Sequence, residues 1–178
     1  MMRAAARFVI RFLAMTPLLL GLAGCFKSAA PLVGEAEAVF PFQTLTIKTP
    51  EGETGILKRQ DNAYVYSEPD ASSPDKEKQQ VVRLYQVEED LYIAQELEEG
   101  GEATYILAKK NGDTIVTRSD CQGLDAATLK NAGIIPPKPD AGLFYECVTN
   151  NLNSLIALAK SPAVWADHTT TLQIVSIE

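Results

Sequence analysis

A series of short β-rich runs, set close together along the chain, constrains the fold more than any other feature of this sequence. The runs are rich in Val, Ile, Leu, Thr and Tyr, and turn residues such as Pro, Gly, Asn and Asp separate them. Segments of this length and composition are typical of β-strands joined by tight turns. They cover residues 42–49, 54–58, 63–68, 81–87, 91–97, 103–110 and 113–119. We therefore predict an antiparallel meander that forms a small barrel or a strongly curled sheet.

The pair Asn111-Gly112 is the strongest hairpin signal in these runs. A two-residue type I′ turn needs positive φ at both central residues, and Asn followed by Gly meets that need best. We therefore predict a type I′ hairpin at this pair.

The pattern changes after Cys121, where two short helices are predicted. Asp125 can cap a helix over residues 126–132, and Gly133 is suited to end it. Asn150 or Asn151 can begin a second helix over residues 152–160, which has apolar residues on one face. A last β-rich run, 171–177, is expected to pair with an edge of the meander. The fold class predicted is α+β, mainly β, with its two short helices near the C-terminus.

The first 24 residues have the character of a secretory signal peptide. Arg3, Arg7 and Arg11 precede an apolar stretch from Phe12 to Gly24, and no acidic residue occurs among them. A transmembrane helix needs roughly 20 apolar residues, so this stretch is too short to span a bilayer. We interpret residues 1–24 as a signal that is removed.

The end of this signal, Leu22-Ala23-Gly24-Cys25, resembles the lipobox of bacterial lipoproteins. The resemblance covers residues 1–25 and implies that a diacylglyceryl group is attached to the Cys25 thiol and that a peptidase cuts before this residue. Phe26 follows where Asp would retain an enterobacterial lipoprotein in the inner membrane, which implies the outer membrane and its periplasmic face. The alternative is an ordinary signal in which Cys25 is a structural thiol.

The rest of the chain is interpreted as an anchor and one domain. Residues 25–38 contain small residues and a proline without periodicity, and we expect the lipidated Cys25 to be followed there by a flexible tether. A coil of that length reaches about 20 Å on average. Residues 39–178 are expected to form a single periplasmic β-rich domain.

Cys121 and Cys147 remain once Cys25 is assigned to lipid. An even pair in an exported protein most simply forms a disulfide. The alternative is a redox or metal pair, but no CxxC occurs and His168 is the single histidine. The formal net charge of −7, which becomes more negative once the arginine-bearing leader is removed, argues against a nucleic-acid partner.

No sequence motif marks a catalytic centre. The chain lacks the GxSxG, P-loop, GxGxxG and HExxH patterns. His168, next to Asp167, could join a Ser–His–Asp arrangement assembled in space, but no serine is marked as a nucleophile. A lone histidine is more often a surface or capping residue. We expect no catalytic residue, cofactor or metal.

An acidic stretch between residues 88 and 102 is the most unusual feature of the domain, because no Lys or Arg interrupts it. A solvated hairpin that resists edge-to-edge aggregation would explain it. A calcium site is a second explanation, although EF-hand spacing is missing. A docking surface for a cationic protein is the third. The acids concerned are Glu88, Glu89, Asp90, Glu96, Glu98, Glu99 and Glu102.

These observations predict a membrane-anchored lipoprotein that acts as a non-enzymatic interaction or envelope-assembly module. The alternative is an inhibitor or ligand-binding lipoprotein that uses the acidic hairpin or a groove lined by Tyr64, Tyr92 and Tyr105. Small periplasmic β-barrel lysozyme inhibitors are similar in size and compartment, although their motifs are not matched here.

Overall fold

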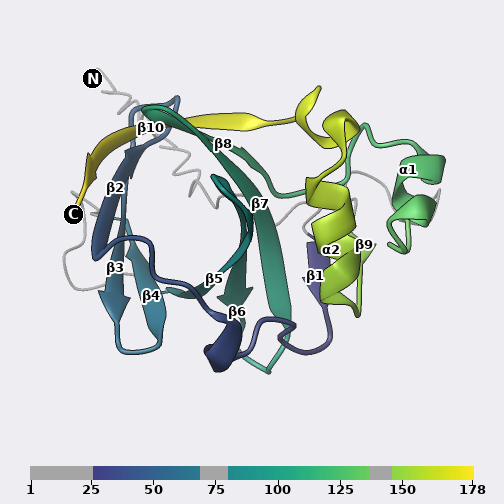
Figure 1. Cartoon of the computed structure of the whole chain (residues 1–178), viewed down its shortest axis with the longest axis horizontal. Coiled ribbons are helices and arrows are strands. Elements are labelled where there is room, and N and C mark those ends of the chain that lie inside the picture. Colours follow the sequence, from purple (N-terminus) through teal and green to yellow (C-terminus); the bar gives the residue numbers. More distant parts are fainter. Residues whose placement is uncertain (1–25, 69–79, 137–145) are drawn as a thin grey trace, which may run out of the picture.

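A closed antiparallel barrel of eight strands forms most of the protein (Figure 1). The computed structural model describes residues 26–68, 80–136 and 146–178. The neighbours around the barrel follow the order β6-β5-β4-β3-β2-β10-β8-β7, and pairing of β6 with β7 closes the ring. The strands are β2 (Thr44–Lys48), β3 (Thr54–Gln60), β4 (Ala63–Ser67), β5 (Gln80–Glu88), β6 (Leu91–Leu97), β7 (Ala103–Asn111), β8 (Thr114–Arg118) and β10 (Thr170–Ile177).

The predicted fold class is confirmed. Consecutive strands from β2 to β8 form the antiparallel meander, and β10 enters between its two ends by pairing with both β2 and β8. Closure by β10 leaves no unpaired edge in the ring, which removes a surface that would otherwise invite aggregation.

The hairpin between β7 and β8 differs from the predicted type I′ turn by one residue. Asn111 pairs with Thr114, so Gly112 and Asp113 are the central residues. Gly112 has φ of 59°, whereas Asp113 is not among the residues with positive φ. Positive φ at the first central position alone, occupied by glycine, is typical of a type II′ turn.

The two predicted helices are present. Helix α1 (Ala126–Asn131) has Asp125 as its N-cap, and the side chain of Asp125 accepts a hydrogen bond from the Thr128 amide at 2.8 Å. Gly133 follows the helix with φ of 74°, a conformation that glycine adopts readily. Helix α2 (Leu152–Ala159) begins after Asn151, and the short helix η2 (Pro162–Trp165) follows it.

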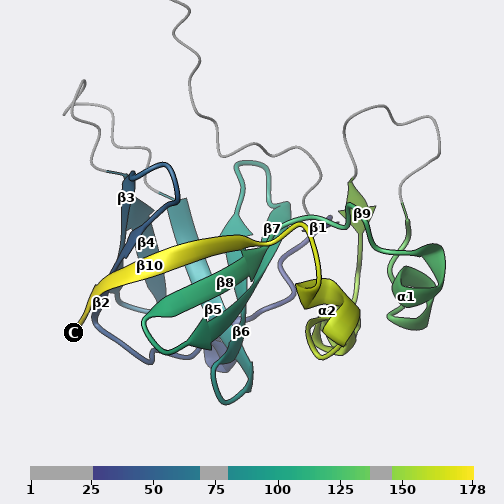
Figure 2. The same ribbon diagram turned by 90° about the horizontal axis from the view of Figure 1, so that it is seen from above.

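Helix α2 lies outside the ring, beside β6 and β7, as both views show (Figures 1 and 2). Because strand side chains alternate between faces, one face of β6 and β7 contributes to a core beneath the helix. That core includes Ile93, Tyr105, Leu107, Leu155 and Leu158. The opposite, inner face contributes to a second cluster around Tyr64, Val82 and Leu84.

The predicted flexible tether is wrong for residues 26–38, because this segment is part of the fold. Strand β1 (Phe26–Ser28) pairs antiparallel with β7 and parallel with the short strand β9 (Cys147–Val148). Phe26 and Val33 are fully buried, and the short helix η1 (Glu35–Glu37) follows. Burial of these apolar side chains outweighs the flexibility that the local composition suggested. Residues 1–25, with the signal and Cys25, lie outside the described residues.

Candidate functional site

The point where the proposed anchor joins the domain is held by the barrel itself. The Phe26 amide donates a hydrogen bond to the Ser119 carbonyl oxygen at 3.1 Å. In register, Phe26 lies between Tyr105 of β7 and Cys147 of β9. Figure 2 shows β1 beside β7 and β9 on the side of the barrel where α2 packs. The backbone that follows Cys25 is therefore fixed from the first residue onward.

A buried polar network fastens the chain that follows β1. The side-chain oxygen Oε1 of Gln95 accepts hydrogen bonds from the amides of Leu32 at 2.7 Å and Val33 at 2.8 Å, and its Nε2 donates to the Val33 carbonyl at 3.0 Å. The hydroxyls of Tyr105 and Ser28 lie 2.6 Å apart in the same network. Burial raises the pKa of the Tyr105 hydroxyl, so this group stays protonated and able to donate.

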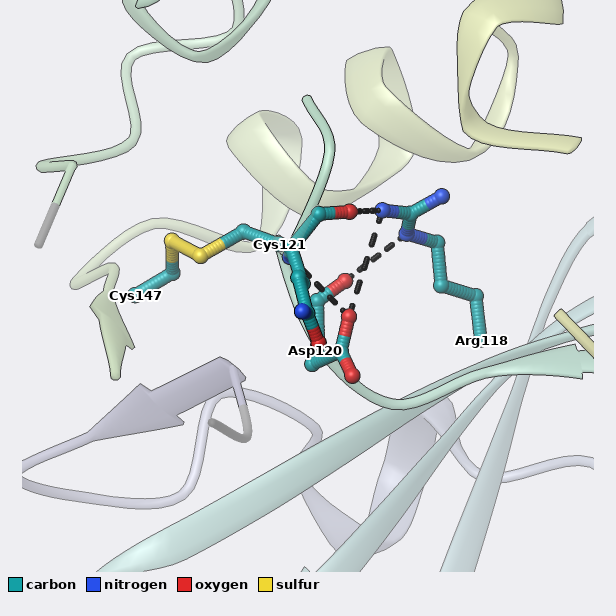
Figure 3. The surroundings of a disulfide bond; sticks show 5 residues. Arg118, Asp120, Cys121 and Cys147 are labelled. Carbon is teal, nitrogen blue, oxygen red and sulfur yellow. Dashed lines mark hydrogen bonds and ion pairs between the residues drawn. A yellow bond between two sulfur atoms is a disulfide. The ribbon is translucent and has the colours of Figure 1, made fainter. Parts of the chain in front are cut away.

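The disulfide between Cys121 and Cys147 is confirmed (Figure 3). Its Cα atoms are 6.2 Å apart, and it links the loop after β8 to β9. Because Cys147 is the register partner of Phe26, the disulfide holds β9 against β1 at the start of the domain. A bridge of this kind suits an oxidising compartment.

Arg118 organises the same region, although no sequence pattern marks it. The side chain is almost completely buried at the end of β8. Its Nη1 donates to the carbonyl oxygens of Val164 at 2.9 Å and Asp167 at 2.6 Å. Its Nε donates to the Asp120 carbonyl at 2.8 Å, and its Nη2 donates to the Gln122 carbonyl (Figure 3). One guanidinium therefore joins β8, the loop that carries Cys121, and the turn after α2.

Burial lowers the pKa of Arg118, and the nearby carboxylates of Asp120 and Asp167 oppose that shift. The Asp120 carboxylate lies 3.9 Å from Nη2. Arginine remains charged throughout the physiological range in such a setting, so its backbone contacts are charge-assisted hydrogen bonds.

His168 packs against this loop. It is exposed, with φ of 54°, and a Cβ at Gly123 would lie 2.5 Å from its Cδ2 atom. Within the described residues, no hydrogen bond joins its imidazole to a serine or a carboxylate. Asp167 contributes its backbone carbonyl to Arg118. The Asp167 backbone, next to His168, therefore helps to hold this turn to Arg118.

The seven predicted partner-binding acids do not form one surface. Glu88, Glu89 and Asp90 lie where β5 turns into β6, whereas Glu98, Glu99 and Glu102 lie where β6 turns into β7. Seven strand residues separate the two turns, a span of about 20 Å. The acids therefore divide into a first group at residues 88–90 and a second group at residues 98–102.

Basic residues offset the first group. Glu88 pairs with Lys160 of the α2 region at 2.7 Å, and Asp90 lies 3.8 Å from Lys110 of β7. The lysines are distant in sequence, so the local run of acids did not reveal them. This finding weakens the first group as a docking surface.

The second group differs from the first in its ion pairs. In the described part of the chain no Lys or Arg forms an ion pair with Glu98, Glu99 or Glu102, and the latter two are exposed. The Thr104 hydroxyl donates to Glu98 at 3.4 Å. Glu96 lies beside this turn on the inner face, opposite Val82 and Thr104.

Other carboxylates at the same end of the barrel affect the pKa of Tyr66. The Tyr66 hydroxyl donates a hydrogen bond to Glu68 at 3.0 Å. Burial is the main cause of its raised pKa, and the carboxylates of Glu68, Glu53 and Glu96 raise it further. Three carboxylates from different parts of the sheet therefore raise the pKa of the same tyrosine at this end of the barrel.

The three tyrosines proposed to line one groove are divided between the two faces of the sheet. Tyr105 belongs to the core under α2, whereas Tyr64 packs on Phe42 inside the barrel with ring centroids 4.6 Å apart. Tyr92 alternates with the outward-facing Leu91 and Ile93, so it shares the inner face with Tyr64. A single groove lined by all three does not form.

The described residues contain no cluster of His, Cys, Asp or Glu able to hold a metal ion. None of the helices in that part of the chain is both long and apolar enough to cross a bilayer. No known protein family, curated protein or solved structure matches this chain.

Proposed function

We propose that this chain is a lipid-anchored protein of the bacterial outer membrane, on its periplasmic face, whose barrel acts as a non-enzymatic interaction or envelope-assembly module. The observation that carries the proposal is Leu22-Ala23-Gly24-Cys25 at the end of a positively charged, apolar leader. The Cys121–Cys147 disulfide supports an exported, oxidising location.

A rigid attachment point suits a module that is presented at a membrane. Two or more acyl chains hold a protein on a bilayer effectively for good, since each buried CH₂ contributes about 0.8 kcal/mol. The chain enters β1 directly after Cys25, so the domain would be displayed at a fixed height above the surface.

Incorporation of labelled fatty acid tests the anchor. Cys25→Ala should give a longer, unprocessed precursor that takes up no label. The matched control is Cys121→Ser together with Cys147→Ser, which removes two thiols and should leave labelling intact. Normal processing and membrane association of Cys25→Ala would refute the lipoprotein assignment.

A second candidate function is binding of a cationic protein at the end of the barrel that carries Glu98, Glu99 and Glu102. It is favoured because, among the described residues, these carboxylates have no lysine partner of the kind that Glu88 and Asp90 have. Carboxylates with no cationic partner attract a basic protein at long range and accelerate its association.

Two triple variants that remove the same number of charges distinguish the binding of a cationic protein from a role of these carboxylates in solubility alone. Glu98→Gln, Glu99→Gln and Glu102→Gln should slow association with a basic probe protein such as lysozyme and reduce its dependence on salt. The control, Glu88→Gln, Glu89→Gln and Asp90→Asn, should change the association rate less. Equal effects of both triples would show that only net charge matters.

A further inference from the structure

Two exposed apolar side chains lie next to the strand that the proposed anchor enters. Val148 is the register partner of Lys27, and Ile135 forms a bridge to Val148 on the other side. Ile135 is 61% exposed and Val148 is 36% exposed, although large aliphatic side chains gain from burial.

The three side chains project from one face. Phe26 and Cys147 point into the core under α2, so the next residues, Lys27 and Val148, point to the opposite face. Ile135 shares that face because it is paired with Val148. We name Lys27, Val148 and Ile135 the anchor face.

The anchor face is close to the proposed lipid. Adjacent Cα atoms are about 3.8 Å apart, so Cys25 is within one residue of the buried Phe26. Neighbouring strands are about 4.8 Å apart, which places Val148 and Ile135 about one and two strand spacings from β1. No flexible residues intervene that could carry the domain away from the bilayer.

We infer that the anchor face rests on the bilayer to which Cys25 is attached, with Ile135 and Val148 in contact with its interfacial region. The lipid supplies the affinity, and the face sets the orientation of the barrel. Lys27, 28% exposed and paired with Glu146 at 2.8 Å, lies at the edge of the contact, where a basic side chain can keep its charged end in water. This inference rests on the proposed lipid anchor.

Depth-dependent quenching of tryptophan in the full lipidated protein tests this orientation. The single Trp165 is replaced by Phe, and one tryptophan is introduced as Ile135→Trp or, as a matched control, Val175→Trp. Val175 on β10 is 59% exposed, nearly the same as Ile135. The protein is reconstituted in phosphatidylethanolamine–phosphatidylglycerol vesicles with or without brominated lipid.

Ile135→Trp should lose most of its fluorescence to brominated lipid, and Val175→Trp should lose little. A Gly/Ser spacer of about 20 residues between Cys25 and Phe26, which reaches about 25 Å, should remove the difference while the protein still floats with the vesicles. The spacer variant thus separates attachment from orientation.

Equal quenching at both positions in a protein that carries fatty acid would overturn the inference and leave the anchor intact. Protection of Ile135→Trp from an aqueous quencher without quenching by brominated lipid would mean that a protein covers this face, which also overturns it. A chain that takes up no fatty acid would refute the anchor and the inference together.

Discussion

The guanidinium Nη1 of Arg118 donates a hydrogen bond to the Val164 carbonyl oxygen at 2.9 Å across 46 residues of sequence. Arg118 ends strand β8, and Val164 lies in the short helix that follows α2. The contact attaches the helical part of the chain to the barrel, and Arg118 itself lies near the disulfide (Figure 3). The buried, charged side chain of Arg118 therefore helps to hold the domain together.

Arg118→Leu should lower the free energy of unfolding by about 3 to 5 kcal/mol, because several carbonyl groups lose a charged donor in a buried setting. Arg118→Lys should recover part of this loss, since one ammonium cannot reach all the acceptors of a guanidinium. Urea denaturation under oxidising conditions measures both. The control is Arg59→Met at a solvent-exposed position, where loss of the contact over the Phe40 ring should cost about 1 kcal/mol or less. Similar losses at both arginines would contradict the role given to Arg118.

Replacing both cysteines of the disulfide by serine should destabilise the domain by about 3.5 kcal/mol on the chain-entropy model. The two cysteines are separated by 26 positions, which sets the size of the loop that the bridge closes. Denaturation of the oxidised protein and of the double variant gives the difference. Thiol labelling of the native protein should detect neither residue until a reductant is added. A free thiol in the native protein would contradict the bridge.

Gln95→Ala should destabilise the domain by about 2 to 3 kcal/mol and increase amide hydrogen exchange at Leu32 and Val33. Gln95 is fully buried and accepts from both of these amides, which would be left without their acceptor. Gln86→Ala, at an exposed position on β5, is the matched control and should have little effect. Unchanged exchange at Leu32 and Val33 in Gln95→Ala would contradict the network that holds the segment after β1.

The N-cap of α1 should weaken at low pH. The Thr128 amide and hydroxyl, which donate to the Asp125 carboxylate, hold its pKa below the ordinary value of 3.8. A group whose pKa is lower in the folded state stabilises the fold above its unfolded-state pKa and loses that contribution as pH falls through the folded-state value.

Asp125→Asn keeps a capping oxygen that does not titrate. The advantage of Asp over Asn at this position should therefore shrink as the pH falls below about 5, as measured by urea denaturation at each pH. Parallel stability curves for the two proteins would show that the carboxylate does not titrate with folding.

The strands of the barrel were predictable because each one combines β-branched residues with a turn signal close to its end. The two helices were predictable for similar reasons, since Asp125 and Gly133 mark the ends of the first one. Strand β1 was not predictable from the sequence, because three residues with one large apolar side chain give no local pattern. Its pairing with Tyr105 joins residues that are far apart in the sequence.

The candidate site was predictable only in part. The disulfide followed from the number of cysteines, but Arg118 looked like any basic residue near the end of a strand. The separation of Glu88 from Glu98 could have been inferred from the strand that lies between them. The lysine that offsets Glu88 could not, because Lys160 approaches through the packing of α2.

The position of β10 between β2 and β8 has a consequence for the order in which the domain can fold. The ring remains open until residues 170–177 are available, because among the described strands β10 is the one that pairs with both β2 and β8. Until then β2 and β8 expose unpaired backbone groups at which partly folded chains can associate. Pairing across such long sequence separations is also slow compared with local hairpin formation. Chains that end before β10 are therefore expected to aggregate, whereas chains that contain it can close the ring.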